Sequence, residues 1–244
     1  MDKNPYDQQS FFRKYSMMER SQKGLAGAGE WHALQQVLPY FKGKSVLDLG
    51  CGYGWHCMYA AENGASKVIG VDQSSKMLEV AKLKSKEYAP IQYVQSSIED
   101  LQLKPKSFDV VLSSLALHYV PSFDDVAKKV YDALKNNGQF IFSVEHPTFT
   151  AEGSQEWMYN DKGMIEHFPV DRYFEEGRRE SNFLGEKIVK YHKTLTTYLN
   201  GLLENGWVLN RVIEPSPPSS MLINEHMYNE LRRPMMLIVA ATKQ

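Results

Sequence analysis

Short apolar runs alternate with stretches of helical periodicity along most of this chain. The runs are almost continuously apolar, which is typical of strands buried on both faces of a parallel sheet. They fall at Val46–Leu49, Lys67–Asp72, Ile91–Gln95, Ser107–Ser114, Gln139–Val144, Val208–Ile213 and Met235–Ala241. The first five runs make four successive β-x-α units, and this order predicts an α/β fold with a doubly wound parallel sheet.

Residues 1–43 precede the first run, and we expect them to form a helical cap. Apolar side chains recur there at helical spacing in two stretches, which a glycine-rich link at Gly24–Gly29 separates. The positions are Phe11, Phe12, Tyr15 and Met18, followed by Trp31, Leu34, Leu38 and Phe41. The pattern predicts two helices joined by a flexible link.

The periodic pattern is lost between Glu145 and Lys190. This segment is rich in aromatic, charged and turn-forming residues and is too long for an ordinary connection. A loop after the fifth strand is placed to cover the crevice at the carboxyl ends of the strands. We therefore expect residues 145–190 to form a substrate-binding lid, with an irregular oligomer contact as the alternative. A helix over Tyr191–Asn205 is predicted to follow.

Composition limits the classes of partner. The 244 residues carry 28 basic and 29 acidic side chains, a net charge of −1, so the chain lacks the basic surplus usual in nucleic-acid-binding proteins. The amino terminus has no signal-peptide pattern and no apolar run is long enough to span a membrane. We expect a cytoplasmic protein with no membrane or nucleic-acid partner, either a monomer or a homodimer.

Candidate metal ligands are too few and too dispersed to predict a metal site. The chain has two cysteines, Cys51 and Cys57, and both are interpreted as small packing residues, with Cys51 near the first loop of interest. His146, His167 and His192 do not have the spacing of a zinc site.

A glycine-rich turn ends the first strand and carries the strongest functional signal. Gly50, Gly52 and Gly54 follow the strand directly, and a helical pattern begins after them. Glycines reach positive φ without penalty and let a ligand lie against the backbone, while the free N–H groups of the following helix point into the same crevice. Trp55 occupies the third glycine position of a dinucleotide fingerprint, which argues against a pyrophosphate ligand. A turn with no ligand is the remaining alternative.

This turn, with Asp48 just before it, resembles motif I of the class I S-adenosylmethionine-dependent methyltransferases. The resemblance implies S-adenosylmethionine as the cofactor and S-adenosylhomocysteine as its product. It also implies a Rossmann-like sheet of seven mostly parallel strands, in which an antiparallel last strand returns as a hairpin partner. Dehydrogenases normally lack that last strand.

Within this family, the whole chain is expected to form a single methyltransferase domain. Residues 1–43 would be the helical cap, 44–144 the cofactor-binding core, and 145–190 the substrate or lid insertion. Residues 191–244 would supply the C-terminal helix and strand pair. The resemblance is close over 44–144 and holds in outline over 191–244.

Asp72 ends the second strand about twenty residues after the glycine turn, where a carboxylate can accept both hydroxyls of a ribose. The family resemblance implies the other contacts to the cofactor. These are Tyr15 and Arg20 at the methionine end; Asp48, Gly50, Cys51, Gly52 and Gly54 in the turn; Gln73 beside Asp72; Met77, Ser97, Ile98 and Glu99 at the adenine; and Ser114 and Leu115 below the methyl group. Ser97 stands where the family usually has an aspartate, so either Ser97 or Glu99 would contact the adenine amine. Solvation of Arg20 and core packing of Met77 are the alternatives at those positions.

A hydroxyl or amine acceptor would also have to lose a proton. Four side chains near the expected strand ends are candidate bases: His118, Glu145, His146 and His192. For each histidine a structural role is the alternative.

The leading hypothesis is a methyltransferase that acts on a small molecule. A tRNA or other RNA methyltransferase is the second, although the balanced charge and the absence of an Asn-Pro-Pro-Tyr or Asp-Pro-Pro-Tyr motif argue against it. A nicotinamide-dependent oxidoreductase, disfavoured by Trp55, and a non-catalytic cofactor-binding module complete the alternatives.

Overall fold

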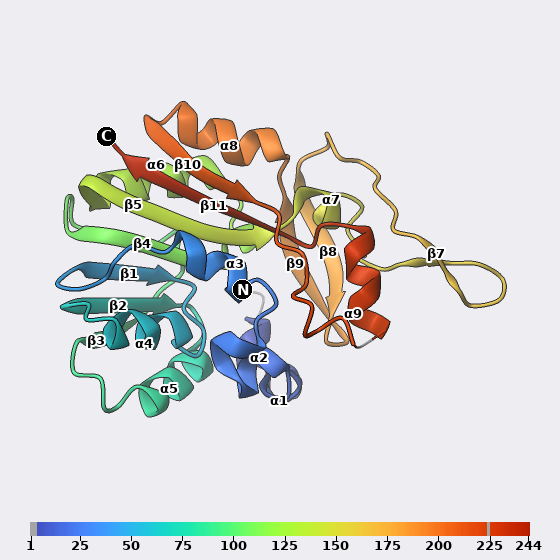
Figure 1. Ribbon diagram of the computed structural model, residues 1–244, viewed down its shortest axis with the longest axis horizontal. Helices are drawn as coiled ribbons and strands as arrows, with labels where there is room; N and C mark the ends of the chain where they lie inside the picture. The colour runs from blue at the N-terminus through green and yellow to red at the C-terminus, as the bar shows by residue number, and fades with distance from the viewer. Residues whose placement is uncertain (1–3, 224) are drawn as a thin grey trace.

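A seven-stranded sheet forms the centre of the computed structural model, which describes residues 4–223 and 225–244 (Figure 1). The strand order is β10-β11-β5-β4-β1-β2-β3. The strands are β1 Ser45–Leu49, β2 Lys67–Asp72, β3 Ile91–Gln95, β4 Phe108–Ser114, β5 Leu134–Glu145, β10 Trp207–Ile213 and β11 Met236–Lys243. The first five pair in parallel, and β11 is antiparallel to both β5 and β10. The predicted fold class is confirmed.

Both faces of the sheet are buried, as the continuous apolar runs predict. Val46 and Val110 belong to one hydrophobic cluster and Leu47 and Val111 to the other, because successive side chains of a strand point to opposite faces. The first cluster includes residues of α3 Trp31–Leu34, α4 Trp55–Glu62 and α5 Ser75–Lys84, and the second includes residues of α6 Phe123–Ala133 and α8 Leu195–Leu203.

The strand order reverses at β1, whose neighbours are β2 on one side and β4 on the other. A crevice opens at the carboxyl ends of the strands at such a reversal. The crossover from β3 to β4, residues 96–107, contains no helix, although a repeated β-x-α pattern predicts one. Ile98 and Leu101 pack there directly against the α6 side of the core, so a short loop covers the sheet.

The cap is divided into shorter helices than the apolar spacing predicts. It contains η1 Pro5–Asp7, α1 Gln9–Ser16, α2 Glu19–Gln22, the 3₁₀ turn η2 Gly24–Gly27, α3, and the 3₁₀ turn η3 Gln35–Val37. The predicted second helix does not continue to Phe41, because Pro39 forces the preceding Leu38 into an extended conformation.

The insertion is more regular than expected. It contains α7 Pro147–Thr150 and two antiparallel ribbons, β6 Met158–Tyr159 with β7 Ile165–His167 and β8 Gly177–Phe183 with β9 Glu186–His192. Figure 1 shows the second ribbon beyond the end of β5. The prediction that a helix begins at Tyr191 is wrong, because that residue lies in β9 and the Thr194 side chain caps α8 by accepting a hydrogen bond from the Thr197 N–H. After β10 come α9 Glu225–Asn229 and η5 Glu230–Arg232.

Specific contacts fasten the cap to the core. Asp7 Oδ1 accepts hydrogen bonds from Ser74 Oγ at 2.7 Å and from the Lys76 N–H at 3.2 Å, at the N-terminus of α5. On the other side of the cap, Lys14 Nζ donates to the Leu184 carbonyl at 2.8 Å, in the turn of the β8–β9 ribbon. The cap therefore bridges the cofactor-binding core and the insertion.

We predict that Asp7→Ala loosens the cap without unfolding the sheet. Removing an acceptor from a helix N-terminus costs about 1 kcal/mol, so hydrogen exchange should accelerate in residues 4–16 and at the start of α5. Asp7→Asn keeps an oxygen acceptor and serves as the control. Unchanged exchange in Asp7→Ala would show that this contact does not hold the cap.

Candidate active site

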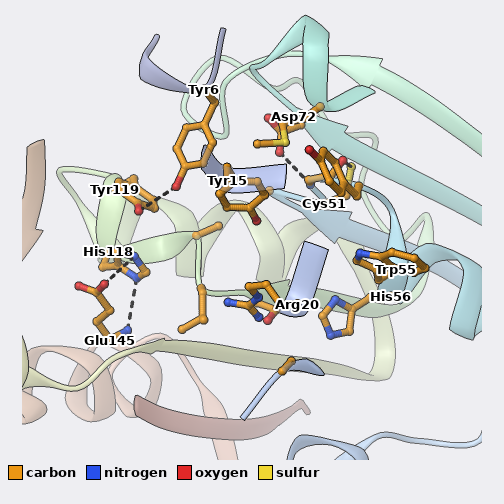
Figure 2. A pocket seen from close by; sticks show the side chains of 18 of the residues that line it. Tyr6, Tyr15, Arg20, Cys51, Trp55, His56, Asp72, His118, Tyr119 and Glu145 are labelled. Atoms are coloured by element: carbon orange, nitrogen blue, oxygen red, sulfur yellow. Dashed lines mark hydrogen bonds and ion pairs between the residues drawn. The ribbon is translucent and has the colours of Figure 1, made fainter. Parts of the chain in front are cut away.

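A cavity of about 430 Å³ lies at the carboxyl ends of β1, β2, β4 and β5. The cap, the glycine turn and the insertion all contribute to its walls. Figure 2 shows Trp55 and His56 at one end, Tyr119, His118 and Glu145 at the other, and Arg20 between them. The two ends are therefore chemically different.

The three glycines of the turn all have positive φ, but for different reasons. A Cβ at Gly50 would collide with the Cβ of Ala116, and one at Gly54 with the Tyr93 hydroxyl. A Cβ at Gly52 would meet no atom within 4 Å, and Gly52 lines the cavity. Gly50 and Gly54 are thus required by packing, whereas Gly52 leaves space that a ligand can use.

Asp72 lies at the end of β2 with its carboxylate oriented by the backbone. Its Oδ2 accepts a hydrogen bond from the Gly52 N–H and its Oδ1 one from the Ser74 N–H, both at 2.9 Å. Burial raises the pKa of Asp72, while these two N–H donors oppose that shift. Each oxygen keeps a lone pair for a further donor.

Most of the residues predicted to contact the cofactor line this single cavity. They are Tyr15, Arg20, Gly50, Cys51, Gly52, Asp72, Gln73, Met77, Ser97, Ile98, Glu99, Ser114 and Leu115. Asp48 and Gly54 lie outside its walls. The Asp48 carboxylate is buried and accepts a hydrogen bond from the Cys57 thiol at 3.3 Å, and burial raises its pKa to about 7. Asp48 therefore supports the turn from beneath.

Cys51 faces the cavity but is not a reactive thiol. Burial raises the pKa of its thiol to about 11, and a nucleophilic cysteine needs a depressed pKa. Its role in the wall is that of a small apolar side chain.

Arg20 reaches the cavity as part of a buried ion pair that sequence reasoning missed. Its guanidinium lies 2.7 Å from Glu30 Oε1, and Glu30 is 1% exposed. Ser114 Oγ also donates to Glu30 Oε1, at 3.4 Å. Glu30 thus joins the cap to the end of β4 and orients the Arg20 guanidinium.

Other cavity residues were also not predicted. Tyr6 and Tyr119 share a hydrogen bond of 2.9 Å between their hydroxyls. Trp55 and His56, in the first turn of α4, line the opposite end. The Trp55 Nε1 is buried without a hydrogen-bond partner in the described structure, and burial lowers the pKa of His56 to about 4. Their position directly after the glycine turn was the signal that could have identified Trp55 and His56.

Two of the four candidate bases lie away from the cavity. His146 Nδ1 accepts a hydrogen bond from the Thr148 N–H at 3.1 Å and so caps α7. His192 is fully buried, with Nδ1 at 2.8 Å from Thr150 Oγ1 and Nε2 at 2.8 Å from the Tyr173 carbonyl. Neither lines the cavity, so the geometry gives both a structural role.

His118 and Glu145 do line the cavity, but their polar atoms are already engaged. His118 Nδ1 accepts a hydrogen bond from the Glu145 N–H at 3.3 Å, and burial lowers the pKa of His118 to about 4. Glu145 Oε1 lies 2.6 Å from Lys190 Nζ. Burial raises the pKa of Glu145, but the Lys190 charge and the hydrogen bonds from Lys190 and Gln155 oppose burial, and the pKa lies below its ordinary value. At neutral pH this wall holds a neutral imidazole and an ionised carboxylate.

Residues 4–223 and 225–244 contain no group of three or more His, Cys, Asp or Glu side chains arranged to hold a metal ion. The same residues form no helix with the length and apolar character needed to cross a membrane.

Known proteins resemble this chain over nearly its whole length. A Listeria monocytogenes protein, whose crystal structure is assigned provisionally to the S-adenosylmethionine-dependent methyltransferases, is 56% identical, with a TM-score of 0.87 over 91% of this chain and 99% of its own. An S-adenosylmethionine-dependent methyltransferase of Mesorhizobium loti is 40% identical, with a TM-score of 0.83 over 90% of this chain and 100% of its own. An uncharacterised Haemophilus influenzae protein is 34% identical over 98% of this chain and 96% of its own.

Two further relatives match over less than half of their own length. A demethylmenaquinone methyltransferase of Lactococcus lactis is 40% identical over 43% of this chain and 44% of its own. A tRNA U34 carboxymethyltransferase of Hahella chejuensis is 33% identical over 47% of this chain and 36% of its own. The family model for a methyltransferase domain matches residues 47–142. With the sheet order and the full-length relatives, these matches show that the chain belongs to the class I S-adenosylmethionine-dependent methyltransferases, enzymes whose cofactor is S-adenosylmethionine.

Proposed function

We propose that this enzyme methylates a small molecule. The observation that carries the proposal is the cavity of about 430 Å³, which has to hold both the cofactor and the acceptor. Ligand pockets of about 300–1,000 Å³ usually hold one drug-sized molecule, so the space left for the acceptor is small. A net charge of −1 also gives no electrostatic support for an RNA substrate.

The cofactor is proposed to lie with its ribose on Asp72 and its backbone-facing side on Gly52. These two residues fit S-adenosylmethionine, because Gly52 leaves space beside the backbone and the Asp72 carboxylate keeps free lone pairs for the ribose hydroxyls. Met77, Ser97, Ile98 and Glu99 would surround the adenine, and Tyr15 and Arg20 the methionine end, with Ser114 and Leu115 near the methyl group. The buried Trp55 N–H and the His56 imidazole lie beyond Arg20, at the end of the cavity away from Glu145, where they can complete the site.

The bound sulfonium supplies a methyl group that a nucleophile attacks in line, while sulfur keeps the electron pair of the broken bond and leaves neutral. The protein has to align the acceptor and exclude water. Tyr6 and Tyr119 close the cavity from the cap and from the loop after β4. Phe149 and Phe183 of the insertion close it from the other side. These four aromatic rings would surround a ring-sized acceptor.

The direct test is methyl transfer from isotopically labelled S-adenosylmethionine to pooled metabolites and, separately, to total RNA. We expect label in a small product and none in RNA. Label in RNA alone would favour the tRNA methyltransferase alternative.

Gly52→Val is expected to abolish S-adenosylhomocysteine binding, because the side chain would occupy the ligand's space. Gly43→Val is the matched control: Gly43 also has a positive φ and no atom within 4 Å of an added Cβ, but it lies outside the cavity walls. Both variants carry the same kind of backbone strain. Calorimetry should therefore detect binding to Gly43→Val only. Equal affinities would contradict the placement of the cofactor on Gly52.

Asp72→Ala should weaken S-adenosylhomocysteine binding by about 1.5–3 kcal/mol, the value of hydrogen bonds to a charged group. Asp109→Ala is the control, because the Asp109 carboxylate pairs with Lys135 and the Ser45 N–H at the opposite edge of the sheet. Wild-type affinity in Asp72→Ala would remove the ribose assignment.

The cap and the insertion are expected to act together as a lid. The Phe11 and Phe183 rings lie 5.8 Å apart, between α1 and the β8–β9 ribbon, and both segments line the cavity. S-adenosylhomocysteine should slow hydrogen exchange in residues 10–30 and 147–185, because it bridges these segments and the core. Exchange that is the same with and without the ligand would contradict a lid.

A further inference from the structure

The wall around Glu145 shows which chemistry the acceptor presents. Glu145 is the last residue of β5 and lines the cavity together with His118 and Gln155. Its carboxylate is ionised and held from behind: Lys190 Nζ lies 2.6 Å from Oε1, and Gln155 Nε2 donates to Oε2 at 2.6 Å. Lys190 is 2% exposed and does not line the cavity. The positive charge is thus shielded from a ligand, while Glu145 itself lines the cavity.

Gln155 has two amide N–H groups and uses one of them inside the protein. Gln155 gives this N–H to Glu145, and its Oε1 accepts from Lys190 at 2.7 Å. His118 Nδ1 is taken by the Glu145 N–H, so its one proton is on Nε2, and that atom lies 3.9 Å from Glu145 Oε1. The Glu145 carboxylate keeps free lone pairs, since two oxygens offer about four acceptor positions and Lys190 and Gln155 occupy two. The His118 Nε2–H and the second Gln155 N–H are neutral donors beside it.

Several other residues that line the cavity carry no charge. Phe149, Phe183 and Met235 are apolar, and Asn182 adds a neutral amide. Tyr6 and Tyr119 bond to each other, which leaves one O–H free between them. Arg20, the cation that lines the cavity, is paired with Glu30. An anionic group at this end would face Glu145 with no available cation.

We propose that the acceptor is a ring-sized molecule that presents a hydroxyl or amine N–H to Glu145, and that carboxylates and phosphates are excluded from this end of the cavity. This inference rests on the proposed small-molecule function and narrows its substrate class. Lys190 acts as a positioning residue, because it fixes the carboxylate without touching the ligand. Excluding phosphates also gives a local reason for rejecting a nucleic-acid backbone.

The test uses three probes of equal ring size: benzyl alcohol, benzylamine and benzoate. Their binding to the protein saturated with S-adenosylhomocysteine is measured by ligand-observed NMR. Benzyl alcohol and benzylamine should bind, and benzoate should bind at least about tenfold more weakly, because like charges in a desolvated site repel strongly. Benzoate binding as well as the other two, or no binding by any of the three, would overturn the proposal.

The double variant Glu145→Gln with Lys190→Met removes both charges and leaves no unpaired buried ion. It should bring the three affinities to within about threefold of one another, since both the repulsion of benzoate and the attraction of the benzylammonium cation have been removed. An unchanged preference in this variant would show that Glu145 does not select the acceptor. Asp109→Asn, an acid removed far from the cavity, should keep the wild-type preference.

Measuring S-adenosylhomocysteine affinity for every variant distinguishes a failure of this inference from a failure of the proposed function. The Glu145–Lys190 variant should bind the cofactor product within about threefold of wild type, because its side chains lie at the acceptor end. Labelled RNA with no labelled small product would refute the proposed function, whereas loss of probe selectivity with intact cofactor binding would refute only the acceptor class.

Discussion

The hydrogen bond from the Gly52 N–H to Asp72 joins the two features on which the site depends. It connects the turn after β1 to the end of β2, across adjacent parallel strands. Parallel pairing brings these strand ends to one edge of the sheet, and the reversal of strand order at β1 opens the crevice there. The carboxylate is thereby fixed before any ligand binds, with lone pairs left over. Preorganisation of this kind reduces the entropy lost on binding.

Sequence reasoning was most successful where the backbone itself makes the site. The apolar runs gave the strands because both sheet faces are buried, and the strand ends then placed Gly52, Asp72, Ile98 and Leu115 around one cavity. Local regularity explains this success, since a parallel sheet sends all its strand ends to the same edge. The glycine motif did not show that Gly52 and Gly54 have different roles. Gly52 leaves space for a ligand, whereas a Cβ at Gly54 would collide with the Tyr93 hydroxyl.

The contributions of the cap and insertion could not be predicted in the same way. Tyr6 meets Tyr119 across more than a hundred residues, and Lys190 meets Glu145 across forty-five. Such contacts depend on how segments without a repeating pattern pack, and single-sequence periodicity contains no information about that. The same limit explains His146 and His192, whose positions near strand ends suggested catalysis. Neighbouring hydroxyl and backbone groups occupy both nitrogens of His192 and Nδ1 of His146, and His146 Nε2 lies 2.8 Å from Glu214 Oε1.

The Glu145–Lys190 pair shows why buried charge near a cavity is informative. Desolvation offsets much of the attraction in a buried ion pair, so well-packed apolar residues could replace it without loss of stability. Lys190 is buried beside the Phe183 ring, with its ammonium 5.5 Å from the ring centroid, which places apolar surface on one side of the pair. Glu145, like Phe183, lines the cavity, whereas Lys190 does not. Stability alone does not account for a charge with this exposure. A carboxylate that is kept ionised and oriented toward a ligand does account for it, because the buried lysine compensates its charge without competing for the ligand.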